Sequence, residues 1–310
     1  MILRPASVNE LSKALAKGAP PGSSIERVDL SAFHGIPEYR PEDMTITVQA
    51  GTKLSLVQET LAQKGQWLPI DPPHQDKLTI DELLNRNPSG PRRFGYGTIR
   101  EHVIGIKAVL ADGRVIQNGG KVVKNVAGFD LCKLFVGSRW SLGIIIEATF
   151  KLRPLPSREI FLIQEFNDLS NAAASLKDIL ESELAPIVID LHSHQLPECS
   201  LVLGFAGSPE EVDWQRDEAA KLGNWTAGTL DYENKFWALP NQPRRLSVLP
   251  SRLTAELEFR KPEAFVARAG NGIIFYRGGL APAESVAPDA LNEQVKKIFD
   301  PKRILPELAP

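Results

Sequence analysis

Apolar and polar residues alternate at characteristic spacings along the chain, and each spacing predicts one kind of element. Val8, Leu11 and Leu15 recur at helical intervals, so we expect a helix near the N-terminus that Gly18 closes. From position 44 to position 50 every second residue is apolar, which predicts a half-buried strand. The first elements are therefore a helix and, after a polar stretch, a strand.

Two local signals then predict a helix and a hairpin. Ser55 and Gln58 have the spacing of a capping box, and Gly65 marks the end of the helix that this box would begin. Residues 102–117 alternate between apolar and polar on both sides of Asp112-Gly113, a dipeptide typical of tight turns. We expect an antiparallel hairpin there.

The order of patterns changes after Pro154 and Pro156. Strand, helix, strand, strand and helix follow one another, and the runs 187–192 and 200–207 are expected to pair as antiparallel neighbours. Two later runs, at 246–250 and 271–279, complete a predicted antiparallel sheet with helices on one face. This half of the chain should form a cap over the first half.

Two further helices carry clear sequence signals. Ser208 and Glu211 form a capping box with Pro209 at the first helical position, and Gly223 ends that helix. The last helix should bury one stripe before Asp300-Pro301, formed by Leu291, Val295, Ile298 and Phe299. We predict an α+β chain in three parts: residues 1–155, 156–285 and 286–310.

Composition excludes several classes of function. The 36 basic and 38 acidic residues give a formal net charge of −2, so nucleic acid and anionic membranes are not expected partners. The two cysteines, Cys132 and Cys199, can form neither a disulfide framework nor an iron–sulfur cluster. With no signal peptide and no apolar run long enough to span a membrane, a soluble cytoplasmic protein is expected.

Glycines cluster beside apolar runs in the middle of the chain. Gly119, Gly120, Gly128, Gly137 and Gly143 permit close approach of the backbone to a large flat or phosphorylated cofactor. Tight turns in a β-rich core explain the same glycines equally well.

The motifs around these glycines resemble a known family. The segment KVVKNVAGFDLCKLFVGSRWSLGIIIEATFKLRPLP is similar to the FAD domain of the vanillyl-alcohol oxidase and p-cresol methylhydroxylase family, which carries GYDLxxLxxGSxGTLGVI along its flavin. SGPRRFGYGTIREHVIG, GGKVVKNVAGFD and VKKIFDPKRIL resemble the E-subunit branch of bacterial glycolate oxidase within that family. The resemblance is strong between positions 44 and 156.

This resemblance implies a fold and a cofactor. The fold would be a p-cresol methylhydroxylase-type FAD-binding domain of two α/β subdomains, with a smaller antiparallel-sheet cap. The first subdomain is truncated, because the chain runs from Gly18 to Val28 without the family's GGGTK-like turn. FAD would be held without a covalent bond, since no histidine or cysteine is evident at the family's linking position.

The family's pyrophosphate motif, TxGG, falls on Thr79 to Glu82, where Asp81 and Glu82 replace the glycines. A carboxylate about 4 Å from a phosphate costs roughly 1 kcal/mol in water and about 4 kcal/mol at an effective dielectric of 20. Either both side chains turn to solvent and the helix amides face the phosphate, which we favour, or Glu82 caps its own helix and the phosphate site is impaired.

Cofactor-binding residues follow from the resemblance. Tyr96 would cover or stack near the isoalloxazine, and Lys124 would stabilise negative charge on the reduced flavin, although a surface lysine is the simpler interpretation. Trp140 stands where the family has glycine, and it either stacks on a ring or blocks one. The full predicted set is Pro72, Thr79, Ser89, Gly90, Gly95, Tyr96, Gly97, Lys124, Asn125, Gly128, Gly143, Ile144 and Ile145.

Catalytic residues cannot be assigned from the sequence. His192 and His194 lie two positions apart on one predicted strand, but no third metal ligand is evident, so no metal site is predicted. His102 has no triad or dyad spacing. A 2-hydroxy acid would need an arginine for its carboxylate, and nothing selects among Arg244, Arg245 and Arg252.

Two hypotheses for function remain open. In the first, the chain is an FAD-dependent oxidoreductase subunit of a glycolate oxidase-like complex, working on a small 2-hydroxy acid beside a second flavin subunit and an iron–sulfur subunit. Electrons would leave to another protein. In the second, the chain is a degenerate structural subunit that has lost tight FAD binding, as the missing turn and the missing TxGG glycines suggest.

Overall fold

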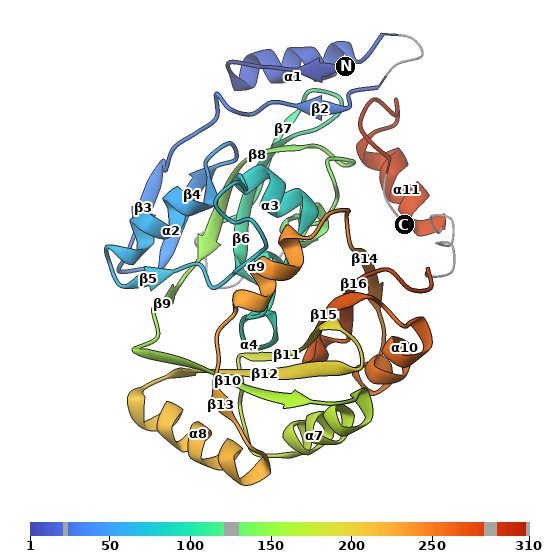
Figure 1. Cartoon of the computed structure of the whole chain (residues 1–310). Helices are drawn as coiled ribbons and strands as arrows, with labels where there is room; N and C mark the ends of the chain where they lie inside the picture. The colour runs from blue at the N-terminus through green and yellow to red at the C-terminus, as the bar shows by residue number, and fades with distance from the viewer. Residues whose placement is uncertain (21–23, 121–129, 282–289, 308–310) are drawn as a thin grey trace.

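The computed structural model describes residues 1–20, 24–120, 130–281 and 290–307. Two sheets organise it, and the chain passes from one to the other after residue 154 (Figure 1). We call the part built on the five-stranded sheet the first lobe and the part built on the seven-stranded sheet the second lobe. This architecture agrees with the predicted α+β fold.

The first lobe has the strand order β3-β4-β8-β6-β7. Its strands are β3 (Glu38–Arg40), β4 (Thr45–Gln49), β6 (Val103–Val109), β7 (Val115–Gly119) and β8 (Ile144–Lys151), with a small pair β5 (Gln66–Trp67) and β9 (Arg153–Pro154) at its edge. β6 and β7 form the predicted hairpin. β4 is buried on both faces rather than one: Thr45 and Thr47 are buried as well as the apolar residues, and the Thr47 hydroxyl hydrogen-bonds that of Thr149 on the adjacent strand β8.

Short helices cover this sheet: α2 (Leu54–Ala62), α3 (Ile80–Arg86), α5 (Ile99–His102) and α6 (Leu131–Phe135). The capping box predicted at Ser55 is wrong. α2 begins at Leu54 with Lys53 as its N-cap, and the Gln58 side chain instead bonds both backbone groups of Leu68, at 2.7 and 3.1 Å. A long-range contact therefore takes the residue that local spacing had assigned to a cap.

The N-terminal segment is small, as the missing turn predicts. β1 (Ile2–Leu3) pairs in parallel with β2 (Arg27–Val28), and α1 (Val8–Lys17) packs Leu11 and Leu15 inward. Its apolar cluster includes Ile304 and Leu305 from the opposite end of the chain. The C-terminal tail thus completes a core that the short N-terminal segment cannot close by itself.

The second lobe has the strand order β13-β10-β12-β11-β15-β16-β14 and is antiparallel throughout. Its strands are β10 (Arg158–Phe166), β11 (Val188–Gln195), β12 (Glu198–Gly207), β13 (Thr226–Ala227), β14 (Arg244–Ser247), β15 (Ala264–Arg268) and β16 (Ile273–Arg277). β11 and β12 pair as predicted.

Helices lie on both faces of this sheet, not on one as predicted. α7 (Leu169–Glu181), α8 (Pro209–Leu222) and α10 (Leu253–Arg260) cover the outer face, and α9 (Asp231–Ala238) covers the face toward the first lobe (Figure 1). The capping box at Ser208 is confirmed. Short 3-10 turns η1 (Pro250–Arg252) and η2 (Ala269–Asn271) connect the remaining elements.

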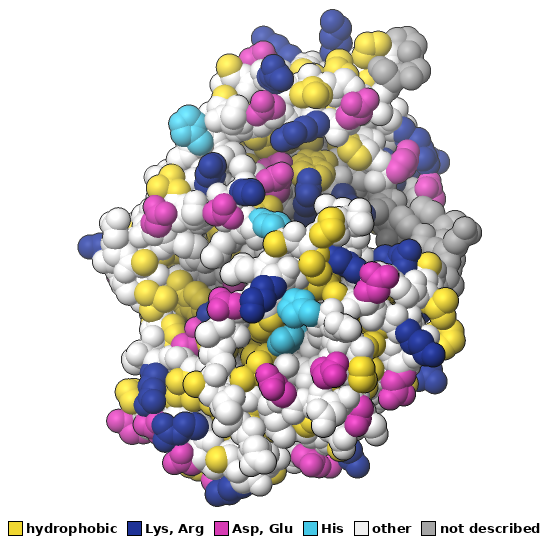
Figure 2. Space-filling model, viewed as in Figure 1, with side chains coloured by type: hydrophobic (Ala, Val, Ile, Leu, Met, Phe, Trp, Pro, Cys, Tyr) yellow, Lys and Arg dark blue, Asp and Glu magenta, His cyan; other side chains and the backbone are white. Residues whose placement is uncertain are grey.

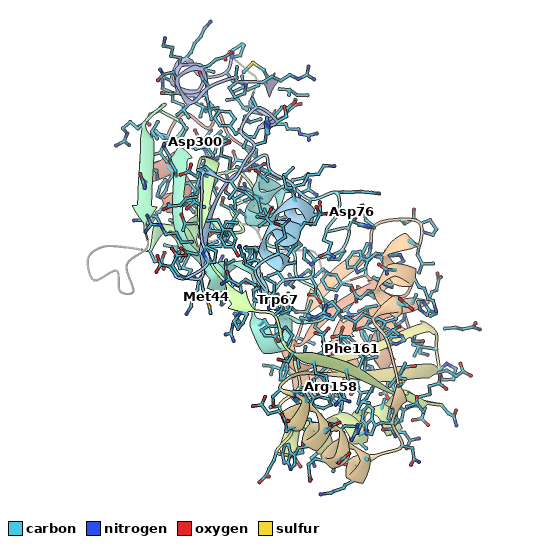
Figure 3. All side chains as sticks on the ribbon, turned by 90° about the vertical axis from the view of Figure 1, so that its left-hand side faces the viewer. Met44, Trp67, Asp76, Arg158, Phe161 and Asp300 are labelled. Carbon is cyan, nitrogen blue, oxygen red and sulfur yellow. The ribbon has the colours of Figure 1, made fainter. Side chains whose placement is uncertain are left out.

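Arg92 joins the two lobes. Its guanidinium bonds Asp71 at 3.0 Å in the first lobe and Glu159 at 2.5 and 2.8 Å in the second. It also lies over the rings of Trp67 and Phe161, which Figure 3 shows at the junction. The short helix α4 (Arg93–Tyr96) follows directly and packs on β11.

The last helix, α11 (Ala290–Phe299), lies against the first lobe, where Phe299 meets Phe135 edge-on at 5.6 Å. Its predicted apolar stripe is partly wrong, because Leu291 and Ile298 are exposed. The buried face instead carries Lys296, whose ammonium pairs with Asp300 at 2.8 Å and donates to the carbonyl of Ser141. Across the described ranges, no helix is long and apolar enough to cross a membrane.

Candidate functional site

A cavity of about 430 Å³ opens in the first lobe between elements from four parts of the chain. Residues 25–31 form one wall, the start of α3 forms another, Trp140 and Ile144 form a third, and Leu305 and Pro306 of the C-terminal tail close it. The predicted residues Thr79 and Ile144 therefore meet in one place. The sequence could not assign the C-terminal tail or residues 25–31 to this site, because neither segment carries a ligand-binding motif.

The start of α3 offers no free amide to a phosphate. Thr79 and Glu82 form the predicted capping box, with the Thr79 amide donating to Glu82 and the Glu82 amide to the Thr79 hydroxyl, both at 3.3 Å. The Ile80 and Asp81 amides donate to the carbonyls of Thr52 and Ala50. All four donors have internal partners, so the alternative that we favoured, with amides facing the phosphate, is wrong.

Asp81 also does not turn to solvent. Its side chain is 7% exposed and accepts hydrogen bonds from the Trp140 indole at 2.9 and 3.0 Å and from the Asn85 amide at 2.9 Å. Burial is the main reason that the pKa of Asp81 rises, to about 7 in all: the Glu82 charge adds to the rise, and the hydrogen bonds from Trp140 and Asn85 and the charge of Arg27 oppose it. Near neutral pH the group is therefore partly protonated.

Trp140 has a backbone conformation that favours glycine. Its φ is +64°, in the left-handed region that a large side chain adopts only at a cost of about 1–2 kcal/mol. The indole bonds to Asp81 and a contact at 5.7 Å with the Arg86 guanidinium hold it there. Asp81 and Trp140, at two positions where the resembled family has glycine, form a hydrogen-bonded pair, and Trp140 lines the cavity; whether it stacks on a ring or blocks one stays a prediction.

Cations line the same cavity. Arg27, Lys53 and Arg86 face four carboxylates, Glu26, Asp29, Asp81 and Glu82. When Asp81 is protonated, the three cations balance the three remaining carboxylates. An anionic group then meets less repulsion in the cavity than the acidic pair in the sequence suggested.

A second cavity of about 640 Å³ lies between the lobes and shares Glu82 and Arg86 with the first. Its walls come from residues 73–88 of the first lobe and from residues 237–243 and Arg277 of the second. On the face of the molecule that Figure 2 shows, Lys and Arg side chains lie across the middle, among acidic ones. Glu82 and Arg86 of α3 thus lie between a cavity that reaches the N-terminal segment and a cavity that reaches the second lobe.

Several predicted residues lie at the junction of the lobes. A Cβ on Gly90 would overlap the carbonyl oxygen of Asp71, and one on Gly95 would come within 2.7 Å of the Ile187 Cα. Packing alone therefore requires both glycines. Nearby, Ser89 accepts a bond from Arg93, Tyr96 meets Trp67 edge-on at 5.2 Å, and Gly97 ends α4.

The remaining predicted residues are scattered. Pro72 and Ile145 are buried, Ile145 in the main core of the first lobe, and Gly143 directly precedes β8. Lys124, Asn125 and Gly128 lie outside the described residues.

His102, His192 and His194 lie against neighbouring residues of the fold. A ring nitrogen of His102 lies 2.9 Å from the carbonyl oxygen of Tyr96. His192 is buried and stacks on Tyr232 with ring centroids 4.3 Å apart, and its ring centroid lies 6.0 Å from that of His194. Within the described ranges no group of three or more potential metal ligands occurs.

Comparison with known proteins identifies the first lobe. A family model described as "FAD binding domain" matches residues 21–119. A structure of alkyldihydroxyacetonephosphate synthase superposes on 98% of this chain and 76% of its own, with a TM-score of 0.72 at 17% identity. Residues 21–119 of the first lobe thus match an FAD-binding domain, which agrees with the predicted type of fold. The superposition shows the fold alone.

Curated relatives of this FAD-binding domain include subunits of glycolate oxidase. GlcD of Bacillus subtilis is 38% identical over 153 residues, 49% of this chain and 33% of that protein. GlcE of Escherichia coli is 33% identical over 165 residues, 53% of this chain and 46% of that protein. A D-lactate dehydrogenase of Anaerostipes hadrus is 27% identical over 205 residues, 66% of this chain and 42% of its length. The chain thus spans a third to a half of these relatives.

The residues present fit FAD, with one change from the family pattern. The two neighbouring cavities offer one compartment beside Trp140 and Ile144 and a second compartment between the lobes. Because the amides of α3 are occupied, Arg27, Lys53 and Arg86 are the groups that would hold the pyrophosphate. Side-chain cations would replace backbone amides at that point.

Proposed function

We propose that this chain is an FAD-dependent oxidoreductase subunit that acts on a 2-hydroxy acid in a complex of the glycolate oxidase type. The observation that carries the proposal is the pair of neighbouring cavities that share Glu82 and Arg86, one within the first lobe and one between the two lobes. Relatives named glycolate oxidase subunit and D-lactate dehydrogenase supply the substrate class. A second flavin subunit and an iron–sulfur subunit are the proposed partners.

The chain's own residues have distinct tasks in this function. Arg27, Lys53 and Arg86 neutralise the pyrophosphate, and Trp140 with Leu305 covers the apolar part of the first cavity. FAD, when bound, supplies the acceptor for the hydride that a hydroxy acid loses on oxidation. Two cysteines cannot ligate an iron–sulfur cluster, so electrons would pass to a separate protein.

A visible absorption spectrum of the purified chain tests this proposal. We expect a yellow protein, or uptake of added FAD with a dissociation constant that isothermal titration can measure. Arg86→Ala should weaken FAD binding roughly tenfold or more, because a hydrogen bond to a charged group contributes about 1.5–3 kcal/mol. Arg114→Ala is the matched control, since that side chain is exposed, pairs locally with Asp112 and lines neither cavity.

A second function has one specific observation in its favour. The occupied amides of α3 and the buried Asp81–Trp140 pair favour a structural subunit that has lost FAD binding. A colourless chain that takes up no FAD, yet co-purifies with a GlcD-like protein, would support this alternative and contradict the proposal.

A further inference from the structure

The buried ammonium of Lys296 has no task in the proposed function as stated so far. Its side chain is 1% exposed. Four oxygen atoms surround the ammonium: one from the Asp300 carboxylate at 2.8 Å, and the carbonyl oxygens of Ser141, Leu305 and Pro306 at 2.9, 3.2 and 2.7 Å. An ammonium group has three donors, so these acceptors use all of them. Lys296 therefore holds together the segments that carry these oxygens.

Asp300 holds the same segment of chain through its backbone amides. Its two carboxylate oxygens accept hydrogen bonds from the amides of Ile304 and Leu305, at 3.0 and 2.9 Å. The Ile304 carbonyl in turn accepts a hydrogen bond from the Ile25 amide at 2.7 Å. The C-terminal tail, residues 300–307, lies outside helices and strands, so side-chain contacts of this kind decide its position.

The segments that these bonds join are three walls of the first cavity. Leu305 and Pro306 line it from the tail, and Ile25 lines it from the N-terminal segment. The third wall includes Trp140, one residue before the carbonyl that Lys296 bonds. Lys296 does not line the cavity, so it acts on the cavity through the backbone that it holds.

Stability alone gives little reason for this ion pair. Removing a lysine and an aspartate from water costs free energy, and well-packed apolar residues of similar volume often stabilise a fold as well or better. Apolar contacts have no direction, whereas an ammonium group needs oxygen atoms at hydrogen-bonding distance. The pair of Lys296 and Asp300 thus supplies a fixed position for the tail.

We propose that Lys296 is a positioning residue for FAD: it holds the C-terminal tail as one wall of the first cavity. The inference rests on the proposed function, because it requires FAD in this cavity. A wall that is already in place spares the cofactor the free energy of ordering it. Without the ammonium the tail is in place for only part of the time, and the apparent affinity for FAD falls by that fraction.

Lys296→Met tests this role, because methionine is a long side chain without a donor. The matched control is Lys297→Met, the same change at the next position of α11, where the side chain is exposed. Phe205→Leu is a stability control, since Phe205 is buried in the core of the second lobe and lines neither cavity.

Isothermal titration measures the dissociation constant of FAD, and stopped-flow flavin fluorescence measures its release. We expect Lys296→Met to raise the dissociation constant roughly tenfold, mainly through faster release, because a coupling of this kind is typically 5- to 150-fold. Lys297→Met and Phe205→Leu should leave both quantities unchanged. Equal losses in Lys296→Met and Phe205→Leu would reduce Lys296 to a purely structural role and overturn the inference.

Hydrogen exchange of the tail gives a readout other than affinity. The amides of Ile304 and Leu305 donate to Asp300, so they exchange only when the tail opens. Coupling between the tail and the cofactor is reciprocal. Saturating FAD should therefore slow this exchange in the parent chain by at least the factor that Lys296→Met loses in affinity.

The results separate failure of this inference from failure of the proposed function. If the parent binds FAD and Lys296→Met binds it equally well, or if FAD leaves the exchange at residues 304–305 unchanged, the inference is overturned and the flavin function stands. A parent chain that takes up no FAD contradicts the proposed function and the inference together. If Lys296→Met does not fold, the exchange measurement on the parent chain decides alone.

Discussion

Asp81 should make the stability of this protein depend on pH in an unusual direction. Most buried carboxylates form ion pairs and favour folding at neutral pH, whereas Asp81 accepts bonds from Trp140 and Asn85 and forms no ion pair with any residue that the structure describes. Its pKa rises from 3.8 to about 7, so the folded state binds the proton more tightly than the unfolded state. The stability from this group is therefore present below pH 4 and is lost as the pH rises through 7.

The size of the effect follows from the two pKa values. The interval from 3.8 to about 7, at about 1.4 kcal/mol per pH unit, corresponds to about 4 kcal/mol. Asp81→Asn keeps the shape and the acceptor oxygen but cannot ionise. The variant should therefore gain about 4 kcal/mol relative to the parent chain as the pH rises from about 4 to about 8.

Urea unfolding of both proteins, followed by tryptophan fluorescence, measures this difference at each pH. Other titrating groups contribute equally to both proteins and cancel in the difference. FAD affinity gives a second readout, because ionised Asp81 repels a pyrophosphate: the parent should bind FAD more weakly as pH passes 7, and the variant should not. A free-energy difference that stays constant from pH 4 to pH 8 would refute the assignment of this pKa to burial.

Three further substitutions test the packing on which the site depends. Gly90→Ala should destabilise the chain by about 3 kcal/mol or more in urea unfolding, because a Cβ overlaps the carbonyl of Asp71, and a loss below about 1 kcal/mol would contradict this. Arg92→Met should cost about 3–5 kcal/mol, measured in the same way, since it leaves Asp71 and Glu159 without their shared cation; an unchanged midpoint would disprove that role. Burial lowers the pKa of His192 to about 4, so its stabilisation is present above pH 6.5 and lost toward pH 4. Between pH 6.5 and pH 4 the parent should lose about 3 kcal/mol more unfolding free energy than His192→Phe. Equal losses in the two proteins would contradict this assignment.

Local signals in the sequence determined much of the secondary structure. The hairpin at 102–117 and the capping boxes at Thr79 and Ser208 depend on residues a few positions apart, and the structure contains all three. The capping box at Ser55 failed because Gln58 bonds Leu68 instead, a contact that no local pattern encodes. The apolar stripe of α11 failed in part because buried Lys296 finds Asp300 and a carbonyl from another element.

The order of the motifs predicted the family and the cofactor, since the glycines and apolar runs between positions 44 and 156 follow one another as they do in the resembled family. It could not determine how the substituted positions Asp81 and Trp140 behave, because they are 59 residues apart and only the fold reveals their hydrogen bond. The sequence fixes which side chains are available, and local free energies of capping and turn formation decide its helices and hairpins. Tertiary structure alone placed Asp81 beside Trp140 and set Arg92 between Asp71 and Glu159, because burial and charge balance depend on neighbours that are remote along the chain.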